Sequence, residues 1–510
     1  MKLDSSEILS RRQAELEARL DPSWQPETSE PVFSSHTGDS ISYEISGRVT
    51  AIDQGGLGVI VQLVQHLGLA EVIDERLHLL KRHLPYHESD HVLNLAYNIL
   101  TGGQCLEDLE QRRQDLGYLN ALDARRIPDP TTAGDFLRRF TAEDVEALMD
   151  AANEVRSRLW RAQPPHRRRL AWIDVDGTIV ATTGECKEGA DFAYTGQWGY
   201  GPLVVSLANS QEVLYAVNRP ANEPSHTGAV RWLDKAVDLV RGSGFEQVRL
   251  RGDTDFSLTT QFDRWTTGGV QFVFGMDAHR SFVARASALG EADWALLERR
   301  TSQPERAGLR LRPKNVKEEK IQEREYKNLR LVREDVAEIP YSPKRARGEY
   351  RMVILRKQIN VEKGQQKLED EIRYFFYVTN VSESELKTEE VVFESNARCH
   401  QENLIEQLKN GVRATQMPVG DLVANWAYMV IGTLAWNLKA WLSLSLPESA
   451  LSRALLKMEY RRFVNEVMGI PAQILRTGRY LVYRLLSLGG RWGEFLIQSS
   501  QWLRQRPRYA

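Results

Sequence analysis

Cysteine is scarce in this sequence, and the three copies that it has form no pattern. Cys105, Cys186 and Cys399 lie far apart, without a Cys-x-x-Cys pair and without histidines at metal-ligand spacing. A disulfide framework and a structural zinc site both depend on such spacing. The sequence therefore argues against both, and the few cysteines fit a protein of the reducing cytoplasm.

A long apolar run is also missing. The first 20 residues are charged throughout and lack the apolar stretch that a signal peptide needs. The longest uncharged run, Leu422 to Leu438, has 17 residues and contains two asparagines and a threonine, so it only reaches the lower limit for a bilayer span. We expect it to form a buried core helix, and we expect no association with a membrane.

The chain has almost no net charge. Its 67 Lys and Arg nearly cancel its 69 Asp and Glu, so binding to nucleic acid has to come from local patches. Residues 299–351 carry 16 Lys and Arg against 9 Asp and Glu, and residues 452–510 carry 11 against 3. Either patch alone is more often an ordinary solvated face.

The length of 510 residues predicts several domains. Residues 1–45 are polar and predict a leader before the fold begins. From Leu57 to Leu159 apolar residues recur at helical spacing, which predicts a helical N-terminal domain at 46–165 that serves DNA binding or dimerisation. Residues 446–510 form a basic C-terminal region.

The apolar period changes from helical to extended after the basic stretch 166–170. Three strands, a helix and two further strands are predicted, in this order: 170–182, 201–209, 212–220, 225–242, 247–253 and 270–277. Three antiparallel strands followed by alternating helix and strand are typical of an RNase H-like sheet. We therefore predict an α/β fold with an RNase H-like catalytic core, a mixed sheet with flanking helices, at 166–280 and 390–445. A β-rich insertion at 281–389 interrupts the core.

Carboxylates end two of the predicted strands. Asp174 and Asp176 are two residues apart, so they project from the same face of their strand. Asp253 ends the fourth strand, and ligand sites in open α/β sheets gather at the carboxyl ends of strands. Cleavage of a phosphodiester suits such a site, because two Mg²⁺ ions about 3.5–4 Å apart stabilise the attacking and leaving oxygens and are held by carboxylates.

A third carboxylate, Glu402, lies in a segment that predicts one continuous helix over residues 397–411. At 100° per residue, Arg398, Glu402 and Lys409 fall on one stripe of that helix. Taken alone, such a stripe is more often an ordinary solvated charge ladder. Asp174 or Asp176 as a turn residue, and Asp253 as a helix cap, are the corresponding structural interpretations.

The stripe resembles a signature of the DDE transposases of bacterial insertion sequences, Tyr-(2)-Arg-(3)-Glu-(6)-Lys. Arg398, Glu402 and Lys409 reproduce its last three members at the right spacing, while Ser395 stands at the Tyr position. Ser can hydrogen-bond a phosphate but cannot stack as Tyr does. The resemblance implies that the transposon end is contacted through its phosphates by Arg398, Lys409 and Ser395.

The two Asp motifs resemble the same family. The strand motif DGT at Asp176 is similar to its first Asp block, and RGDTDF at Asp253 is similar to its second. Within the group, TGQWGYGPL, VNRPAN and RGDTDF are most similar to the insertion-sequence family numbered 1380, and the resemblance covers about residues 50–485. The gap between Asp253 and Glu402 matches relatives with a β-rich insertion.

The resemblance implies a catalytic and metal-binding triad of Asp176, Asp253 and Glu402, with two Mg²⁺ ions for which Mn²⁺ substitutes. Asp174 is the alternative first ligand. The implied activity is a transposase that cleaves transposon ends and joins them to target DNA. Its partners are double-stranded DNA, as terminal inverted repeats and as target, and a second copy in a homodimer. It would act in the bacterial cytoplasm, on the nucleoid when bound to DNA.

Two alternatives remain. DVDGT also matches the first motif of haloacid dehalogenase-type phosphatases, in which Asp174 would be the nucleophile and Asp176 the general acid and base. The other alternative is a domesticated relative that binds DNA without transposition activity.

Overall fold

The computed structural model describes residues 49–298, 329–362, 365–478, 480–487 and 490–506, together with residues 10, 14 and 508. The predicted leader at 1–45 therefore lies outside the described residues, apart from two positions. Residues 299–328, the most basic part of the first patch, lie outside them as well. The elements below all belong to one unit, Thr50–Ala510.

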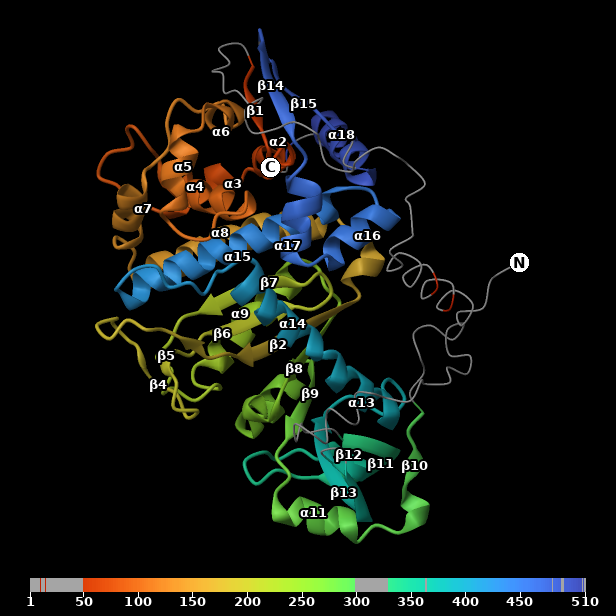
Figure 1. Ribbon diagram of the computed structural model, residues 1–510. Coiled ribbons are helices and arrows are strands. Elements are labelled where there is room, and N and C mark those ends of the chain that lie inside the picture. Colours follow the sequence, from red (N-terminus) through yellow and green to blue (C-terminus); the bar gives the residue numbers. More distant parts are fainter. Residues whose placement is uncertain are drawn as a thin grey trace. The chain divides into compact units, whose positions relative to one another are not determined.

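A nine-stranded mixed sheet, in the order β10-β11-β12-β13-β9-β8-β2-β6-β7, is the centre of this unit (Figure 1). Its first group of strands is β2 (Leu170–Gly177), β6 (Leu203–Leu207), β7 (Glu212–Val217), β8 (Gln247–Gly252) and β9 (Val270–Met276). β2, β6 and β7 pair antiparallel, whereas β8 runs parallel to both β2 and β9. All five strands lie where the alternating pattern predicted them.

The helix predicted between the third and fourth strands is α9 (Ala229–Gly242). Its buried side chains lie one turn apart on a single face, at Trp232, Leu233, Ala236, Val237 and Val240. Burial of such a stripe against β2, β6, β7 and β8 stabilises the helix far more than its intrinsic propensity does.

The uncharged segment at 422–438 lies in the 24-residue helix α15 (Leu422–Ser445), which is buried on nearly all sides. It contacts β7, and the Trp426 indole donates a hydrogen bond to the Ala216 carbonyl. The prediction of a buried core helix is thus confirmed. Among the described residues, no single helix is long and apolar enough to cross a membrane; one bent pair of N-terminal helices meets that test by length and composition only.

The N-terminal segment is helical, as its periodicity predicted, apart from the short strand β1 (Ala51–Ile52). Its helices are α2 (Leu57–Leu67), α3 (Leu69–Arg76), α4 (Glu88–Leu100), α5 (Asp108–Gln114), α6 (Leu116–Ala121), α7 (Pro130–Leu137) and α8 (Ala142–Arg161). α15 packs against α2, α4, α7 and α8, so it lies between these helices and the core strands (Figure 1). The buried apolar side chains of both regions form one continuous core.

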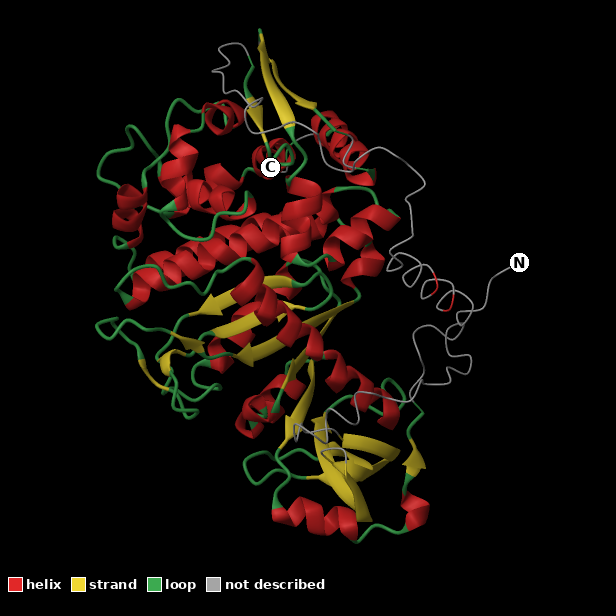
Figure 2. Cartoon of the chain, viewed as in Figure 1, coloured by secondary structure: helices red, strands yellow, loops and turns green. Residues whose placement is uncertain are grey.

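The predicted insertion adds strands to the same sheet. Its elements are α11 (Arg280–Ser287), β10 (Ala295–Leu296), β11 (Leu329–Tyr341), β12 (Tyr350–Glu362) and β13 (Gln365–Thr379). β13 pairs antiparallel with β9, and α11 and α13 (Thr388–Ala397) pack beside these strands (Figure 2). The insertion therefore extends the core sheet at its β9 edge.

The C-terminal region is folded in its described part. It contains α16 (Ala450–Lys457), α17 (Tyr460–Phe463), β14 (Ala472–Thr477), β15 (Tyr480–Leu485) and α18 (Arg491–Gln505). β14 pairs with β15 and with β1, so strands from the two ends of the unit form one small sheet. A third sheet, β3 (Val180–Ala181), β5 (Trp198–Tyr200) and β4 (Asp191–Phe192), follows β2 in the chain.

Candidate active site

Asp176 and Asp253 meet at one edge of the nine-stranded sheet. β2 and β8 are parallel neighbours, and their register pairs Asp174 with Arg251. Asp176 and Asp253 each lie two residues further along, so they stand side by side at the carboxyl ends of their strands. The structure thus brings together two of the three predicted carboxylates by strand register alone.

Ionisation of both carboxylates is penalised by burial. The pKa of Asp176 is raised to about 7, chiefly by burial and then by the charge of Asp253, while Arg398 opposes both. The pKa of Asp253 is also raised by burial; Arg398 lowers it, while Asp255 and Asp277 raise it. Two half-buried anions whose ionisation is penalised in this way favour a bound cation.

Asp253 also has the structural role that its position suggested. One of its carboxylate oxygens accepts a hydrogen bond of 3.0 Å from the Asp255 backbone N–H, which caps the short helical turn Thr254–Phe256. The chain approaches closely here, because a Cβ at Gly252 would lie 2.8 Å from the Phe256 Cβ. Capping uses one oxygen and holds the carboxylate in place, so the other oxygen remains for a ligand.

Glu402 reaches this edge through Arg398. Arg398 joins α13 to α14 (Cys399–Glu406), and its guanidinium bonds both Asp176 and Glu402, each over 3.2 Å. The Glu402 side chain is 57% exposed, against 14% for Asp176. Ser395 lies in the last turn of α13, half-buried, and its carbonyl accepts the Arg398 backbone N–H.

The prediction of one continuous helix over 397–411 is wrong. α14 ends at Glu406, and the next five residues, Gln407–Gly411, form a π-helical turn that contains Lys409. An angle of 100° per residue does not apply across this turn, so the calculated stripe fails for Lys409. Lys409 reaches the site by another route: its ammonium donates to the Thr178 hydroxyl (2.9 Å) and to the Ile179 carbonyl (2.7 Å), directly after β2.

Burial lowers the pKa of Lys409, and Glu406 partly restores it. Thr178 and Ile179 follow Asp176 by two and three residues. The contacts of Lys409 therefore fix the chain as it leaves β2.

Asp174 is not available to a ligand. Its side chain is 1% exposed, and Arg251 bonds both of its oxygens, over 2.6 and 2.8 Å. Burial raises the pKa of Asp174, and Arg251 lowers it. Of the two aspartates on β2, only Asp176 is open to a ligand at the sheet edge. The motifs assign no role to Arg251, but an arginine within an apolar strand signals a buried partner.

Arginines of β8 also hold α13 in place. Arg249 bonds both oxygens of Glu394 over 3.0 Å, and Arg251 donates to the Glu394 carbonyl. Glu394 lies four residues before Arg398. These contacts tie α13, which leads into Arg398, to the strand that ends just before Asp253.

Gln401 anchors α14 to the sheet. It is 1% exposed, accepts a hydrogen bond from the Ser206 hydroxyl, and donates to the Val204 carbonyl of β6. Its neighbour Glu402 consequently points away from β6. No sequence motif signals this role, because a lone glutamine on a helix is usually solvated.

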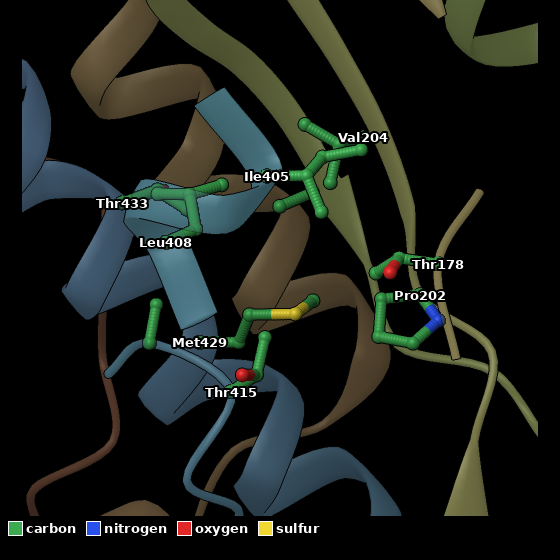
Figure 3. A pocket seen from close by; sticks show the side chains of 10 residues that line it. Thr178, Pro202, Val204, Ile405, Leu408, Thr415, Met429 and Thr433 are labelled. Atoms are coloured by element: carbon green, nitrogen blue, oxygen red, sulfur yellow. The ribbon is translucent and has the colours of Figure 1, made fainter. Parts of the chain in front are cut away.

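The apolar face below α14 is closely packed. Figure 3 shows Ile405 and Leu408 facing Val204 of β6 and Met429 of α15, with Thr178 at the margin. The cavity between them measures about 10 Å³, which is less than a substrate needs. The helix that carries Glu402 is therefore held in place by close packing against β6 and α15.

The donor set suits a hard divalent cation, because Asp176, Asp253 and Glu402 offer only carboxylate oxygens. Among the described residues, however, no three His, Cys, Asp or Glu side chains are close enough to hold a metal ion together. Arg398 lies between Asp176 and Glu402 and supplies the positive charge there.

Comparisons with known proteins agree with the motifs. A family model described as "Transposase DDE domain group 1" matches residues 33–492. No curated protein matches the chain. Among solved structures, the synaptic complex of piggyBac transposase with hairpin DNA is similar at 10% identity, over 81% of this chain and 84% of that chain. Its TM-score is 0.32, too low to support an argument about fold or function.

Proposed function

The chain belongs to the family described as Transposase DDE domain group 1, and from this premise we propose that it cleaves transposon ends and joins them to target DNA. The observation that carries the proposal is the parallel register of β2 and β8, which sets Asp176 beside Asp253. Arg398 links Glu402 to the same edge. Three carboxylates from three separate segments thus each interact with Arg398.

The catalytic core is an RNase H-like fold in this proposal. The support is the strand arrangement: three antiparallel strands, β2, β6 and β7, then α9, and then two strands that extend the sheet in parallel on the other side of β2. A parallel connection through a helix places strand ends at one edge, where ligands bind.

Asp176, Asp253 and Glu402 form the metal-binding triad, with two Mg²⁺ ions or with Mn²⁺ in their place. Bound metal would supply charge stabilisation for the attacking and leaving oxygens of the phosphodiester. The chain's own part is orientation. Asp253 is held by its cap, Glu402 by the Gln401 anchor and Arg398, and Asp176 by the register of β2.

Arg398, Lys409 and Ser395 face the phosphates of the transposon end. Arg398 has the best-supported part, because its guanidinium lies among the carboxylates and can exchange them for a phosphate once cations neutralise the carboxylates. In its present contacts Lys409 supports the strand end, and its positive charge adds to the attraction for DNA.

The partners are double-stranded DNA, as terminal inverted repeats and as target, and a second copy in a homodimer. The dimer follows from the reaction, since two ends must be processed together. The motifs favour a bacterial insertion sequence of the family numbered 1380, acting in the cytoplasm.

The phosphatase alternative is disfavoured by the state of Asp174. A nucleophile must be accessible, whereas Asp174 is buried and bonded through both oxygens to Arg251. A DNA-binding relative without activity is disfavoured by the presence of all three carboxylates. A cleavage assay distinguishes such a relative from an active transposase.

The experiment is cleavage of a duplex that carries the DNA flanking this reading frame, with and without Mg²⁺. Wild type is compared with Glu402→Gln and with a control, Glu406→Gln, which removes an exposed carboxylate one turn along the same helix. We expect Glu402→Gln to bind DNA but not to cut it, while Glu406→Gln cuts like wild type. Cleavage by Glu402→Gln at the wild-type rate would contradict the triad. No cleavage by wild type would favour the inactive relative.

A further inference from the structure

A basic cavity lies at the opposite end of β2 from Asp176. It measures about 460 Å³ and is bounded on one side by residues 163–172, where the chain leaves α8 and enters β2. The other side is α16 with the segment before it, about 280 residues later in the sequence. The ion pair between Arg167 and Glu448 (3.0 Å) joins the two sides.

The cavity combines cations with an apolar base. Among the described residues, its lining holds five Lys and Arg and one His against a single carboxylate, Glu448. The Lys and Arg side chains are Arg167, Arg168, Arg169, Arg453 and Lys457, and the histidine is His166. Leu207, Phe245 and Leu456 supply apolar surface between them. A chain whose overall charge is −2 thus concentrates an excess of about four positive charges in one place.

The single carboxylate is already shared. Glu448 accepts from Arg167 over 3.0 Å and from Arg453 over 2.9 Å, and both arginines lower its pKa. Arg169 and Lys457 are exposed, and no carboxylate of the described residues lies within ion-pair distance of either. Two cations at the rim therefore have no acidic partner in the described part of the chain.

Arg168 is a second, independent sign of a missing ligand. Its Nε is buried and has no hydrogen-bond partner within the described residues, while one terminal nitrogen donates a long bond of 3.4 Å to the Gly244 carbonyl. A buried guanidinium nitrogen without an acceptor is costly, and a bound anion would satisfy it.

We propose that this cavity, defined by Arg168, Arg169 and Lys457, binds phosphates of the DNA backbone at a place remote from the scissile bond. Six residues of β2 separate its Leu170 end from Asp176, on the order of 20 Å at about 3.3 Å per residue. Cations on two elements around an apolar base suit successive phosphates and the sugars between them. The choice of DNA as the anion rests on the proposed function. The excess of positive charge is a property of the residues that line the cavity and does not depend on that function.

The test is binding of the full-length protein to a fluorescent duplex over a series of salt concentrations. The double variant Arg169→Glu with Lys457→Glu is compared with wild type and with a matched control, Arg125→Glu with Arg280→Glu. The control reverses two exposed arginines elsewhere on the chain. We expect the cavity variant to bind at least about 10-fold more weakly at 0.1 M salt. The slope of log affinity against log salt should fall by roughly 2, while the control changes less.

For Glu448→Gln we expect the opposite effect on DNA binding. Removing the carboxylate frees Arg167 and Arg453 for phosphate, so affinity and salt slope should both increase. Circular dichroism and thermal unfolding check that each variant is folded. At saturating DNA the cleavage rate should be unchanged in all of them, because the cavity lies away from the carboxylates.

Three results would overturn the proposal. The cavity variant could bind DNA like wild type, or it could lose no more than the control. The third result is that tripolyphosphate raises the thermal stability of wild type but not of the cavity variant, while both proteins bind DNA with equal affinity. That result would assign the cavity to a small anion. If wild type never cuts DNA but the cavity variants bind DNA as expected, the proposed function is wrong, while the assignment of the cavity to DNA phosphates is supported.

Discussion

Two aspartates on one strand differ in their surroundings: Asp174 is buried in an ion pair, whereas Asp176 is partly exposed at the edge of the sheet. They are two residues apart on β2, project from the same face, and each is bonded to an arginine. The Asp174–Arg251 pair is buried, 1% and 6% exposed, and uses both carboxylate oxygens. The Asp176–Arg398 pair is less buried and longer, and Arg398 divides its donors between Asp176 and Glu402.

The difference shows what separates a structural ion pair from a candidate site. Arg251 and Asp174 satisfy each other and also hold α13 through the Glu394 carbonyl. Asp176 lies beside Asp253, so one arginine faces more negative charge than it can neutralise. An unbalanced cluster at the surface is where a cation or a phosphate is expected to bind.

The largest expected effect is on cleavage. Asp176→Asn keeps the shape but removes a carboxylate from the proposed triad, and cleavage of the transposon end should fall by about 10³-fold or more. Asp174→Asn, the matched change two residues earlier, should leave the folded protein active to within about 10-fold, since Asp174 touches no ligand. Equal losses from both changes would erase the distinction between the two pairs.

The next effect is on stability. Arg251→Met leaves the Asp174 carboxylate buried without its partner, which should lower the free energy of unfolding by roughly 3–5 kcal/mol in urea titrations. Adding Asp174→Leu removes the unpaired charge and should recover much of the loss. A single variant as stable as wild type would show that Arg251 is not needed to hold Asp174.

The pH dependence of stability should report on Asp176. Its pKa in the folded protein is about 7, above the value of about 3.9 for an unfolded Asp, so the folded chain binds more protons between these values. The contribution of Asp176 to the free energy of unfolding therefore falls as pH rises from about 4 to about 7. Urea titrations in EDTA should show a shallower decline in Asp176→Asn than in wild type. Identical profiles would place the pKa of Asp176 near its ordinary value.

The smallest expected effect is on stability, and it comes from the more exposed pair, Asp176 with Arg398. Arg398→Met should change the free energy of unfolding by about 1 kcal/mol or less, because the Glu402 side chain is mostly solvated and Asp176 can take up a proton. The same variant should bind the transposon end more weakly if Arg398 contacts its phosphates. A loss of stability as large as that of Arg251→Met would make the two pairs equivalent.

Local pattern was sufficient for much of the fold. The five core strands and α9 lie where alternation and helical spacing predicted them, because a buried face repeats every second residue in a strand and every third or fourth in a helix. The π turn at Gln407–Gly411 follows no such repeat. Because of this turn, an angle of 100° per residue does not give the direction of the Lys409 side chain.

The chemical identity of the candidate residues was determined by the sequence alone. Asp176, Asp253, Arg398, Glu402 and Lys409 stand in spacings that resemble a known signature, and spacing is a property of the chain. The tertiary structure decided which aspartate on β2 is open to a ligand, that Gln401 anchors α14, and that residues 166–169 meet α16 around a cavity. Burial and pairing depend on partners that are remote in the sequence, and only folding determines which partners meet.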